Sequence, residues 1–247
     1  MIRPVFPWHD LPGLAGGIDK DGGRAAELLA LGFGSVEIGS VLPAAAPAVA
    51  ATLAAGGAAR CGAVGVGLGL PAELPADGLR KAWLAGFAAL WPVADYLSFN
   101  LSATASRRFL LPENLPRLAF ACLAAVFQRD LRFAESERYV PLALKLPLGN
   151  CGEALPTAAF IAAAAGFDLL TVVLPDEAGR FERLAELARN LDDGPALVAV
   201  GGIRSALDVV AARQAGAAGV QVHRLFVEPG PACLATLLRS SPVNGQK

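Results

Sequence analysis

One lysine stands inside a strongly apolar segment, and lysine is a residue type that can stabilise negative charge on a ligand. Lys145 is the fourth residue of the run Leu142-Ala143-Leu144-Lys145-Leu146. The chain holds 4 lysines against 17 arginines, so a lysine in this place asks for a specific explanation. A buried ammonium group costs several kcal/mol unless it is paired or faces a polar ligand. We therefore expect Lys145 to line a ligand site.

Glycine and polar residues follow the short apolar runs of the chain, at the carboxyl end of each run. They are Gly16, Gly17 and Lys20 after the first run, Ser40 after the second, Asn100 and Ser102 after the fourth, Gly201 and Gly202 after the seventh, and His223 and Arg224 after the eighth. Glycines let a flat ligand approach the backbone. A glycine pair before a helix that Ser205 opens offers backbone N–H groups and a helix dipole to a phosphate. Each residue also has a plainer interpretation as a turn, a loop cap or a structural histidine.

The elements that must position these residues alternate regularly along the chain. Short apolar runs predict buried strands at 14–17, 35–38, 63–68, 96–101, 142–146, 169–173, 197–200 and 219–222. The segments between them predict helices at 23–31, 44–55, 79–90, 115–127, 154–165, 181–191, 206–215 and 232–238. Eight such units in 247 residues predict an α/β fold, a single (β/α)8 TIM barrel over residues 1–247. In that fold the chemistry belongs at the carboxyl ends of the strands.

The competing architecture is an open, doubly wound sheet. It requires a G-x-G-x-x-G turn directly after the first strand. Here Gly65, Gly67 and Gly69 alternate inside the third predicted strand instead, with the wrong spacing. The barrel is therefore the favoured prediction.

Composition excludes several classes of partner. The formal net charge of −1 gives no electrostatic footprint for nucleic acid or for an anionic membrane. The sequence contains no stretch of about 18 uninterrupted apolar residues, so it predicts no transmembrane segment. Residues 1–8 lack the apolar core of a signal peptide. The cysteines show no C-x-x-C spacing, which argues against a metal site or disulfides and for a cytoplasmic protein. We expect a small-molecule substrate, and the abundant Ala and Leu would suit a homo-oligomer interface.

Four segments carry a resemblance to a known family. They read G-L-A-G-G-I-D-K-D-G at 13–22, G-F-G-S-V-E-I-G-S-V-L-P at 32–43, A-D-Y-L-S-F-N-L-S at 94–102, and V-G-G-I at 200–203 followed by G-V-Q-V at 219–222. Over about residues 12–238 the chain resembles the dihydroorotate dehydrogenases, FMN-dependent (β/α)8 oxidoreductases of pyrimidine biosynthesis. The first two segments are most similar to the quinone-linked class.

The resemblance implies an FMN site, position by position. It implies that Gly16 and Gly17 lie against the flavin, that Ser40, Asn100 and Lys145 contact it, and that Lys20 stands at the edge between flavin and substrate. It also implies that Gly201, Gly202 and the backbone of His223 and Arg224 hold the phosphate, with Gly179 matching a loop glycine. FMN is the cofactor to expect on this basis.

The substrate half of the family pattern is missing. Ala103 occupies the position of the family's general base, and Ala105, Gly67 and Val173 occupy substrate-binding positions. Ser102, Thr104 and Ser106 are the candidates left to act as base, but the spacing selects none of them. Because adjacent strand residues point to opposite faces, we expect Ser102 to face away from the position that Ala103 faces. A more apolar pocket and a substrate other than dihydroorotate follow.

Three functions remain open from the sequence. The leading one is an FMN-dependent oxidoreductase, of the CH–CH donor class that the family resemblance implies. A second is a non-catalytic or scaffolding homologue that keeps the barrel and has lost flavin turnover. A third is an enzyme of phosphorylated sugars that uses the phosphate site after the seventh and eighth strands alone. Bound flavin separates the first from the other two.

Overall fold

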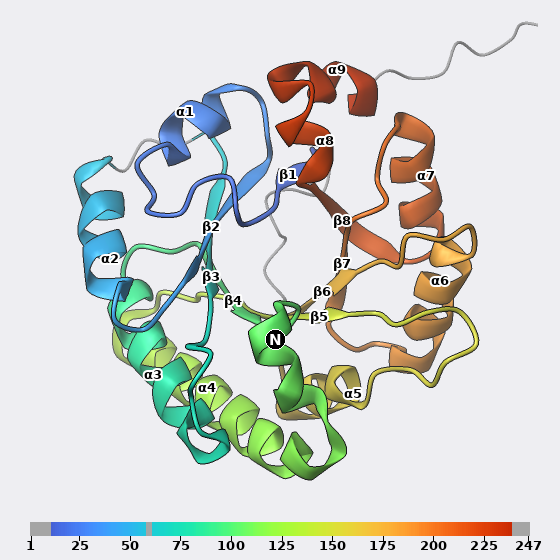
Figure 1. Cartoon of the computed structure of the whole chain (residues 1–247). Helices are drawn as coiled ribbons and strands as arrows, with labels where there is room; N and C mark the ends of the chain where they lie inside the picture. Colours follow the sequence, from blue (N-terminus) through green and yellow to red (C-terminus); the bar gives the residue numbers. More distant parts are fainter. Residues whose placement is uncertain (1–10, 58–60, 239–247) are drawn as a thin grey trace, which may run out of the picture.

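The computed structural model describes residues 11–57 and 61–238, which form a barrel of strands inside a ring of helices (Figure 1). In this part of the chain eight parallel strands pair in sequence order, and β1 pairs with β8 to close the barrel. The strands are β1 (Gly13–Leu14), β2 (Ser35–Val41), β3 (Ala63–Leu68), β4 (Tyr96–Asn100), β5 (Leu142–Pro147), β6 (Leu169–Val173), β7 (Ala196–Val200) and β8 (Ala217–Val222). The predicted TIM barrel is confirmed.

Each predicted helix is present, and short ones add to them. The helices are α1 (Ala25–Ala30), α2 (Ala46–Ala55), α3 (Leu79–Leu90), α4 (Leu115–Ser136), α5 (Thr157–Ala165), α6 (Arg180–Leu191), α7 (Ala206–Gln214), α8 (Arg224–Val227) and α9 (Cys233–Leu238). Four 3-10 turns, unforeseen like α8, are η1 (Ala76–Gly78), η2 (Thr104–Leu110), η3 (Pro112–Asn114) and η4 (Gly230–Ala232). Ser205 caps α7 as expected, since its Oγ accepts a hydrogen bond from the Asp208 amide at 3.2 Å.

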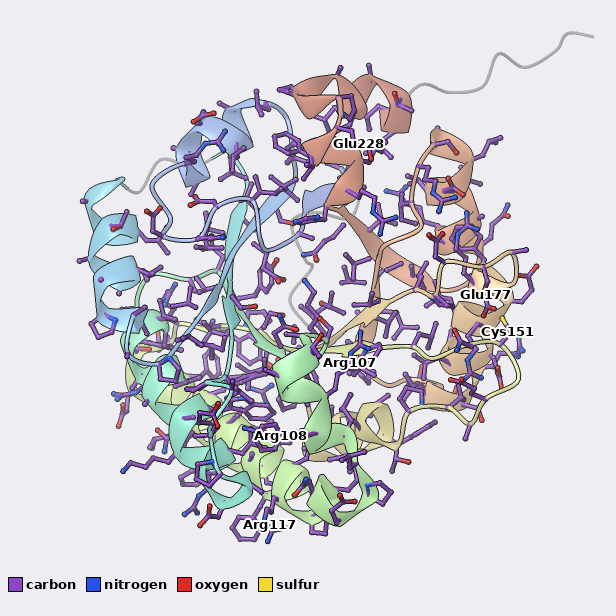
Figure 2. The ribbon with its side chains drawn as sticks, in the orientation of Figure 1. Arg107, Arg108, Arg117, Cys151, Glu177 and Glu228 are labelled. Carbon is purple, nitrogen blue, oxygen red and sulfur yellow. The ribbon has the colours of Figure 1, made fainter. Side chains whose placement is uncertain are left out.

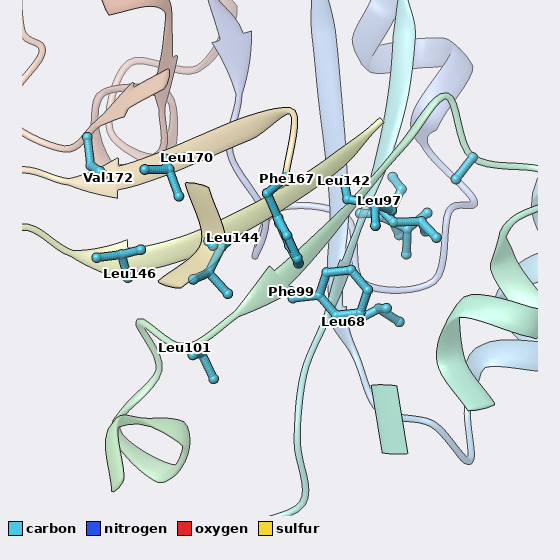
Figure 3. Close-up of a cluster of buried hydrophobic side chains, with 14 of the residues drawn as sticks. Leu68, Leu97, Phe99, Leu101, Leu142, Leu144, Leu146, Phe167, Leu170 and Val172 are labelled. Atoms are coloured by element: carbon cyan, nitrogen blue, oxygen red, sulfur yellow. The ribbon is translucent and has the colours of Figure 1, made fainter. Parts of the chain in front are cut away.

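Apolar packing between strands and helices explains why the strands read as continuous hydrophobic runs. Figure 3 shows part of this layer, with Phe99 and Phe167 among leucines of β3 to β6. The Phe99 ring centroid lies 4.5 Å from that of Trp83 on α3 and 5.7 Å from that of Phe167. Strands that are covered on both faces in this way need few polar residues. The polar residues that do occur on strands therefore mark the inside of the barrel.

Residues 1–8, whose sequence lacks a signal-peptide pattern, lie outside the described residues, as do both ends of the predicted domain 1–247. Among residues 11–57 and 61–238, no group of three or more His, Cys, Asp and Glu side chains could hold a metal ion. In the same residues no single helix is long and apolar enough to cross a membrane. The helical segments Thr104–Leu110 and Pro112–Ser136 are long and apolar enough only when taken together, and the chain bends by 75° between them.

Candidate functional site

A cavity of about 670 Å³ opens at the carboxyl ends of the strands. It collects the predicted residues Gly16, Asn100, Ser102, Lys145, Gly201, Gly202, His223 and Arg224 from five different strand ends. Asp176, Arg204 and Glu228 also line it and were not foreseen. A second hollow, at the opposite end of the barrel beside Cys61 and Asp95, gathers none of the predicted residues. The carboxyl face is therefore the candidate site.

Other predicted residues stand around this cavity rather than in its wall. Lys20 lies exposed on the loop between β1 and α1, and Ser40 lies exposed near the end of β2. Gly17 has φ +115°, and a Cβ built on it would come within 2.8 Å of the His223 Nε2 atom. Gly179 lies at the start of α6, where its carbonyl accepts from the Cys151 thiol at 3.1 Å. Figure 2 shows Cys151 at the outer edge of the ring, so Gly179 belongs to the periphery of the site.

Lys145 lines the cavity and belongs to a buried ion pair. The Lys145 ammonium donates to Glu37 Oε1 at 3.0 Å, and the two residues are 6% and 1% exposed. The Tyr96 hydroxyl donates to Glu37 Oε2 at 3.4 Å, and the Gln221 amide donates to the Tyr96 oxygen at 3.0 Å. Burial raises the pKa of Tyr96 well above its ordinary value, and the Glu37 charge raises it further, so Tyr96 stays a donor. Lys145 thus lines the cavity, as expected, and is also ion-paired. From the sequence, these two roles were alternatives.

Small residues keep room for the Glu37 carboxylate. A Cβ built on Gly16 would lie 3.0 Å from Glu37 Oε1, and one built on Gly67 would lie 3.2 Å from the same atom. Gly67 stands at a position where the resemblance implies a substrate-binding residue. Here it faces the acid of the buried ion pair.

Asn100 organises the cavity wall next to Lys145. Its Nδ2 donates to Ser40 Oγ at 2.6 Å, while its Oδ1 accepts from the Ser102 amide at 2.9 Å and from the Ser102 hydroxyl at 2.7 Å. Asn100 thereby ties the end of β2 to the loop after β4. The Arg107 Nε donates to the Ser102 carbonyl at 3.1 Å, and Figure 2 places Arg107 near the middle of the barrel. No spacing in the sequence pointed to Arg107.

Three of the residues at or near the position of the family's general base, Ala103, Thr104 and Ser106, do not line the cavity. Ala103 and Thr104 lie exposed at the start of η2, and Ser106 is buried within it. Ser102 lines the cavity and Ala103, the residue that it was expected to face away from, does not. β4 ends at Asn100, so strand alternation no longer governs the residues that follow. Ala105 is exposed as well, whereas Val173 does line the cavity.

The opposite wall has the features of a phosphate site. Gly201 and Gly202 have φ +83° and +68°, values that favour glycine. A Cβ on Gly202 would come within 2.7 Å of the Arg180 Cδ atom, and Arg180 is itself held by Asp208 at 2.7 Å. Arg204 forms an ion pair with Asp176, and the Arg224 Nη1 lies 3.7 Å from the other oxygen of Asp176. Two arginines therefore flank the glycine turn.

His223 stands between the two walls and titrates below its ordinary range. Partial burial lowers its pKa from the ordinary 6.5, and the positive charges of Lys145 and Arg224 lower it further. We expect an NMR titration of the imidazole to give a midpoint below 6.5. Arg224→Gln moves the midpoint upward and Arg117→Gln, on the remote helix α4, leaves it unchanged. Because the pKa of His223 is lower in the folded protein than in the unfolded chain, the folded protein binds fewer protons. His223 therefore lowers the stability of the fold as the pH falls below about 6.5. A wild-type midpoint at or above 6.5 contradicts this assignment.

Comparison with known proteins agrees with these features. No protein-family model matches the chain. Dihydroorotate dehydrogenase (quinone) from Cupriavidus taiwanensis is 29% identical, with 91% of this chain and 82% of that protein aligned. The enzyme of the same name from Bordetella parapertussis is 26% identical, with 92% and 80% aligned. A solved structure of ligand-free DHODH from Eimeria tenella superposes with a TM-score of 0.75 at 19% identity, covering 92% of this chain and 82% of that one. The chain is thus similar to dihydroorotate dehydrogenases over about nine tenths of its length, and its barrel has the fold of the solved enzyme.

Proposed function

We propose that this protein is an FMN-dependent oxidoreductase that acts on a substrate other than dihydroorotate. The observation that carries the proposal is the cavity itself. It brings Gly16, Asn100, Lys145 and the Gly201–Gly202 turn to one face from strand ends far apart in the sequence. These are the positions that the family resemblance assigns to flavin and phosphate.

The residues present fit FMN. A cavity of about 670 Å³ lies within the range of small-molecule and cofactor sites. A Cβ on Gly201 would have its nearest neighbour at 3.6 Å, so this turn presents open backbone to the cavity. The Lys145 ammonium and the Asn100 amide stand at the end that would take the ring. When bound, FMN supplies the hydride acceptor, a chemistry that no side chain provides.

The chain's own residues then define what the substrate must be. Lys145 offers a cation held in place by Glu37, and a fixed positive charge stabilises negative charge on a bound ring. The Ser102 hydroxyl donates to the Asn100 amide oxygen, which cannot take up its proton, so Asn100 does not activate Ser102 as a general base. Val173 adds apolar wall where the family pattern places a polar contact. A ring that needs fewer hydrogen bonds than dihydroorotate, and little help in losing a proton, suits this site.

Absorbance of the purified protein tests the proposal. A yellow protein, or a colourless one that gains a flavin spectrum with FMN, supports it, and mass measurement of the released ligand identifies the cofactor. A protein that takes up no FMN contradicts it. That result favours a non-catalytic homologue or an enzyme of phosphorylated sugars, which binding of a sugar phosphate would separate.

The placement of the phosphate predicts how a charge at Gly201 acts. Gly201→Asp puts a carboxylate beside the proposed phosphate, and we expect it to weaken FMN binding at least tenfold relative to Gly201→Ala. The alanine variant is the matched control, because it carries the same backbone strain at φ +83° without the charge. Riboflavin, which lacks the phosphate, should bind the two variants equally. Equal FMN affinities for the two variants would place the phosphate elsewhere.

A further inference from the structure

The buried acid beside Lys145 stands directly behind the wall of the cavity. Glu37 does not line the cavity itself, but its close neighbours Lys145 and Gly16 both do. The Lys145 ammonium lies 3.0 Å from Glu37 Oε1, and a Cβ built on Gly16 would lie 3.0 Å from the same atom. The proposed function places both neighbours against the flavin. A change of charge on the flavin therefore acts on Glu37 at short range, where little water screens it.

The charge of Glu37 is balanced by Lys145, the one cation that the described part of the chain pairs with it. The other donors to Glu37, the Tyr96 hydroxyl at 3.4 Å and the Gln221 amide at 3.5 Å, are neutral. Burial raises the pKa of Tyr96 well above its ordinary value, so Tyr96 keeps its proton. Negative charge on a neighbouring ring attracts the same ammonium group. The buried carboxylate is then less well compensated, which favours its protonated form.

Gln221 provides the partner that a protonated Glu37 needs. Its Nε2 atom donates to the Tyr96 oxygen at 3.0 Å and to Glu37 Oε2 at 3.5 Å. Its Oε1 atom is buried and has no hydrogen-bond partner among the described residues, which is uncommon for a buried acceptor. A carboxylic acid has an O–H group that must donate, and half a turn of the Gln221 amide points Oε1 toward it. Gln221 thus suits the ionised acid through Nε2 and the protonated acid through Oε1.

We propose that Glu37 is a redox-linked proton site, which takes up one proton when the flavin is reduced and releases it when the flavin is oxidised. This role rests on the proposed function, because it needs FMN in the cavity. A hydride from the substrate carries two electrons and one proton to the flavin and adds one negative charge beside Lys145. A second proton comes from the solvent and binds a carboxylate oxygen of Glu37. Two electrons and two protons therefore enter the protein together, and the net charge of the site stays the same.

Other titratable groups near this charge have to be distinguished from Glu37. The elements packed around it contribute Lys145 and Tyr96, along with the neutral residues Gly16, Gly67 and Gln221. His223 lines the same cavity, and partial burial and nearby positive charges lower its pKa, so it is neutral above about pH 6.5. Asp176 and Glu228 line the mouth, where both are exposed to water. Glu228 therefore offers a matched comparison for Glu37, as the same residue type in a hydrated place.

The reduction potential of the bound flavin, measured against pH, counts the protons. Each proton that accompanies two electrons shifts the equilibrium constant tenfold per pH unit, which is about 30 mV. Above about pH 7.5 an ordinary imidazole is neutral, and the flavin ring itself accounts for one proton. There the potential of the wild type should fall by about 60 mV per pH unit, and that of Glu37→Gln by about 30 mV. Glu228→Gln and His223→Gln should both keep the slope of the wild type.

An infrared difference spectrum of the FMN-loaded wild type, reduced minus oxidised, tests the same step without relying on the folding of Glu37→Gln. Proton uptake by Glu37 should give a carboxylic-acid carbonyl band that shifts when the glutamate residues are isotopically labelled and persists in Glu228→Gln. A wild-type slope of one proton with no such band overturns the proposal and leaves the proposed function intact. A slope that drops in His223→Gln instead assigns the proton to His223 and overturns it too. A protein that binds no FMN contradicts the proposed function and this role together.

Discussion

Dihydroorotate is expected to bleach the flavin of the FMN-loaded protein at less than about 0.01 per second, against the 1 per second or more of a working enzyme. The absence of a placed base costs about 10²–10⁴-fold in rate. Each unmatched polar group of the substrate costs a further 1–3 kcal/mol or so in binding. At the positions that the resemblance assigns to base and substrate, Ala103 has no side-chain proton acceptor, and Ala105 and Gly67 have no side-chain group that could hydrogen-bond a pyrimidine. The missing base lowers the rate at saturation, and the weaker binding raises the dihydroorotate concentration that is needed to reach saturation.

Anaerobic stopped-flow absorbance at saturating dihydroorotate measures this rate. Dithionite is the control, since it must bleach the same flavin fully. Ser102 is the hydroxyl in the cavity wall and could supply residual activity, and Ser102→Ala reveals that contribution. Bleaching near 1 per second in the wild type would show that the chain builds the substrate site from residues other than those of the family pattern.

Loss of the Lys145 ammonium is expected to destabilise the fold by about 3–5 kcal/mol, the usual cost of leaving one buried charge without its partner. In Lys145→Met the Glu37 carboxylate, 1% exposed in the barrel, keeps only the neutral donors Tyr96 and Gln221 among the partners described. From the sequence alone, the same substitution would weaken flavin binding and leave the fold intact. The ion pair at 3.0 Å changes that expectation to a loss of both.

The double variant Glu37→Gln with Lys145→Met separates the two effects. It removes both charges and keeps a side chain that Tyr96 and Gln221 can hydrogen-bond, so urea unfolding should return to within about 1.5 kcal/mol of the wild type. Its FMN affinity should stay as low as that of Lys145→Met, because the cation facing the ring is still missing. A single variant as stable as the wild type would mean that water reaches the pair.

The fold could be predicted from the sequence because each strand and helix of the barrel has a local pattern of apolar and polar residues. β3, β6 and α3 begin and end at the predicted residues, since apolar runs between polar turns fix them. α4 runs nine residues beyond its predicted end at 127, through the polar run Gln128-Arg129-Asp130. Arg129 is buried there and pairs with Asp168 at 2.7 Å. That contact lies 39 residues away in the sequence, so local polarity pointed to the wrong end.

The site could be predicted only in part, because it also depends on contacts between residues far apart in the sequence. Glycines and polar residues at strand ends identified most of the cavity wall. The partner of Lys145 lies 108 residues away, and pairing it with Glu37 requires the register of the closed barrel. Which of Ser102 and Ala103 would line the cavity could not be predicted, because the strand stops at Asn100, a detail that no spacing in the sequence encodes.

The arginines at the mouth of the cavity do not leave it positively charged. Asp176 contacts both Arg204 and Arg224, and Glu228 adds a second acid to the same wall. Two cations and two anions cancel, so the mouth has little field to draw in a phosphate-bearing molecule from a distance. Entry is then governed by diffusion and shape, and its rate should be nearly indifferent to ionic strength. The same cancellation leaves the mouth with little electrostatic attraction for nucleotides and other cellular polyanions.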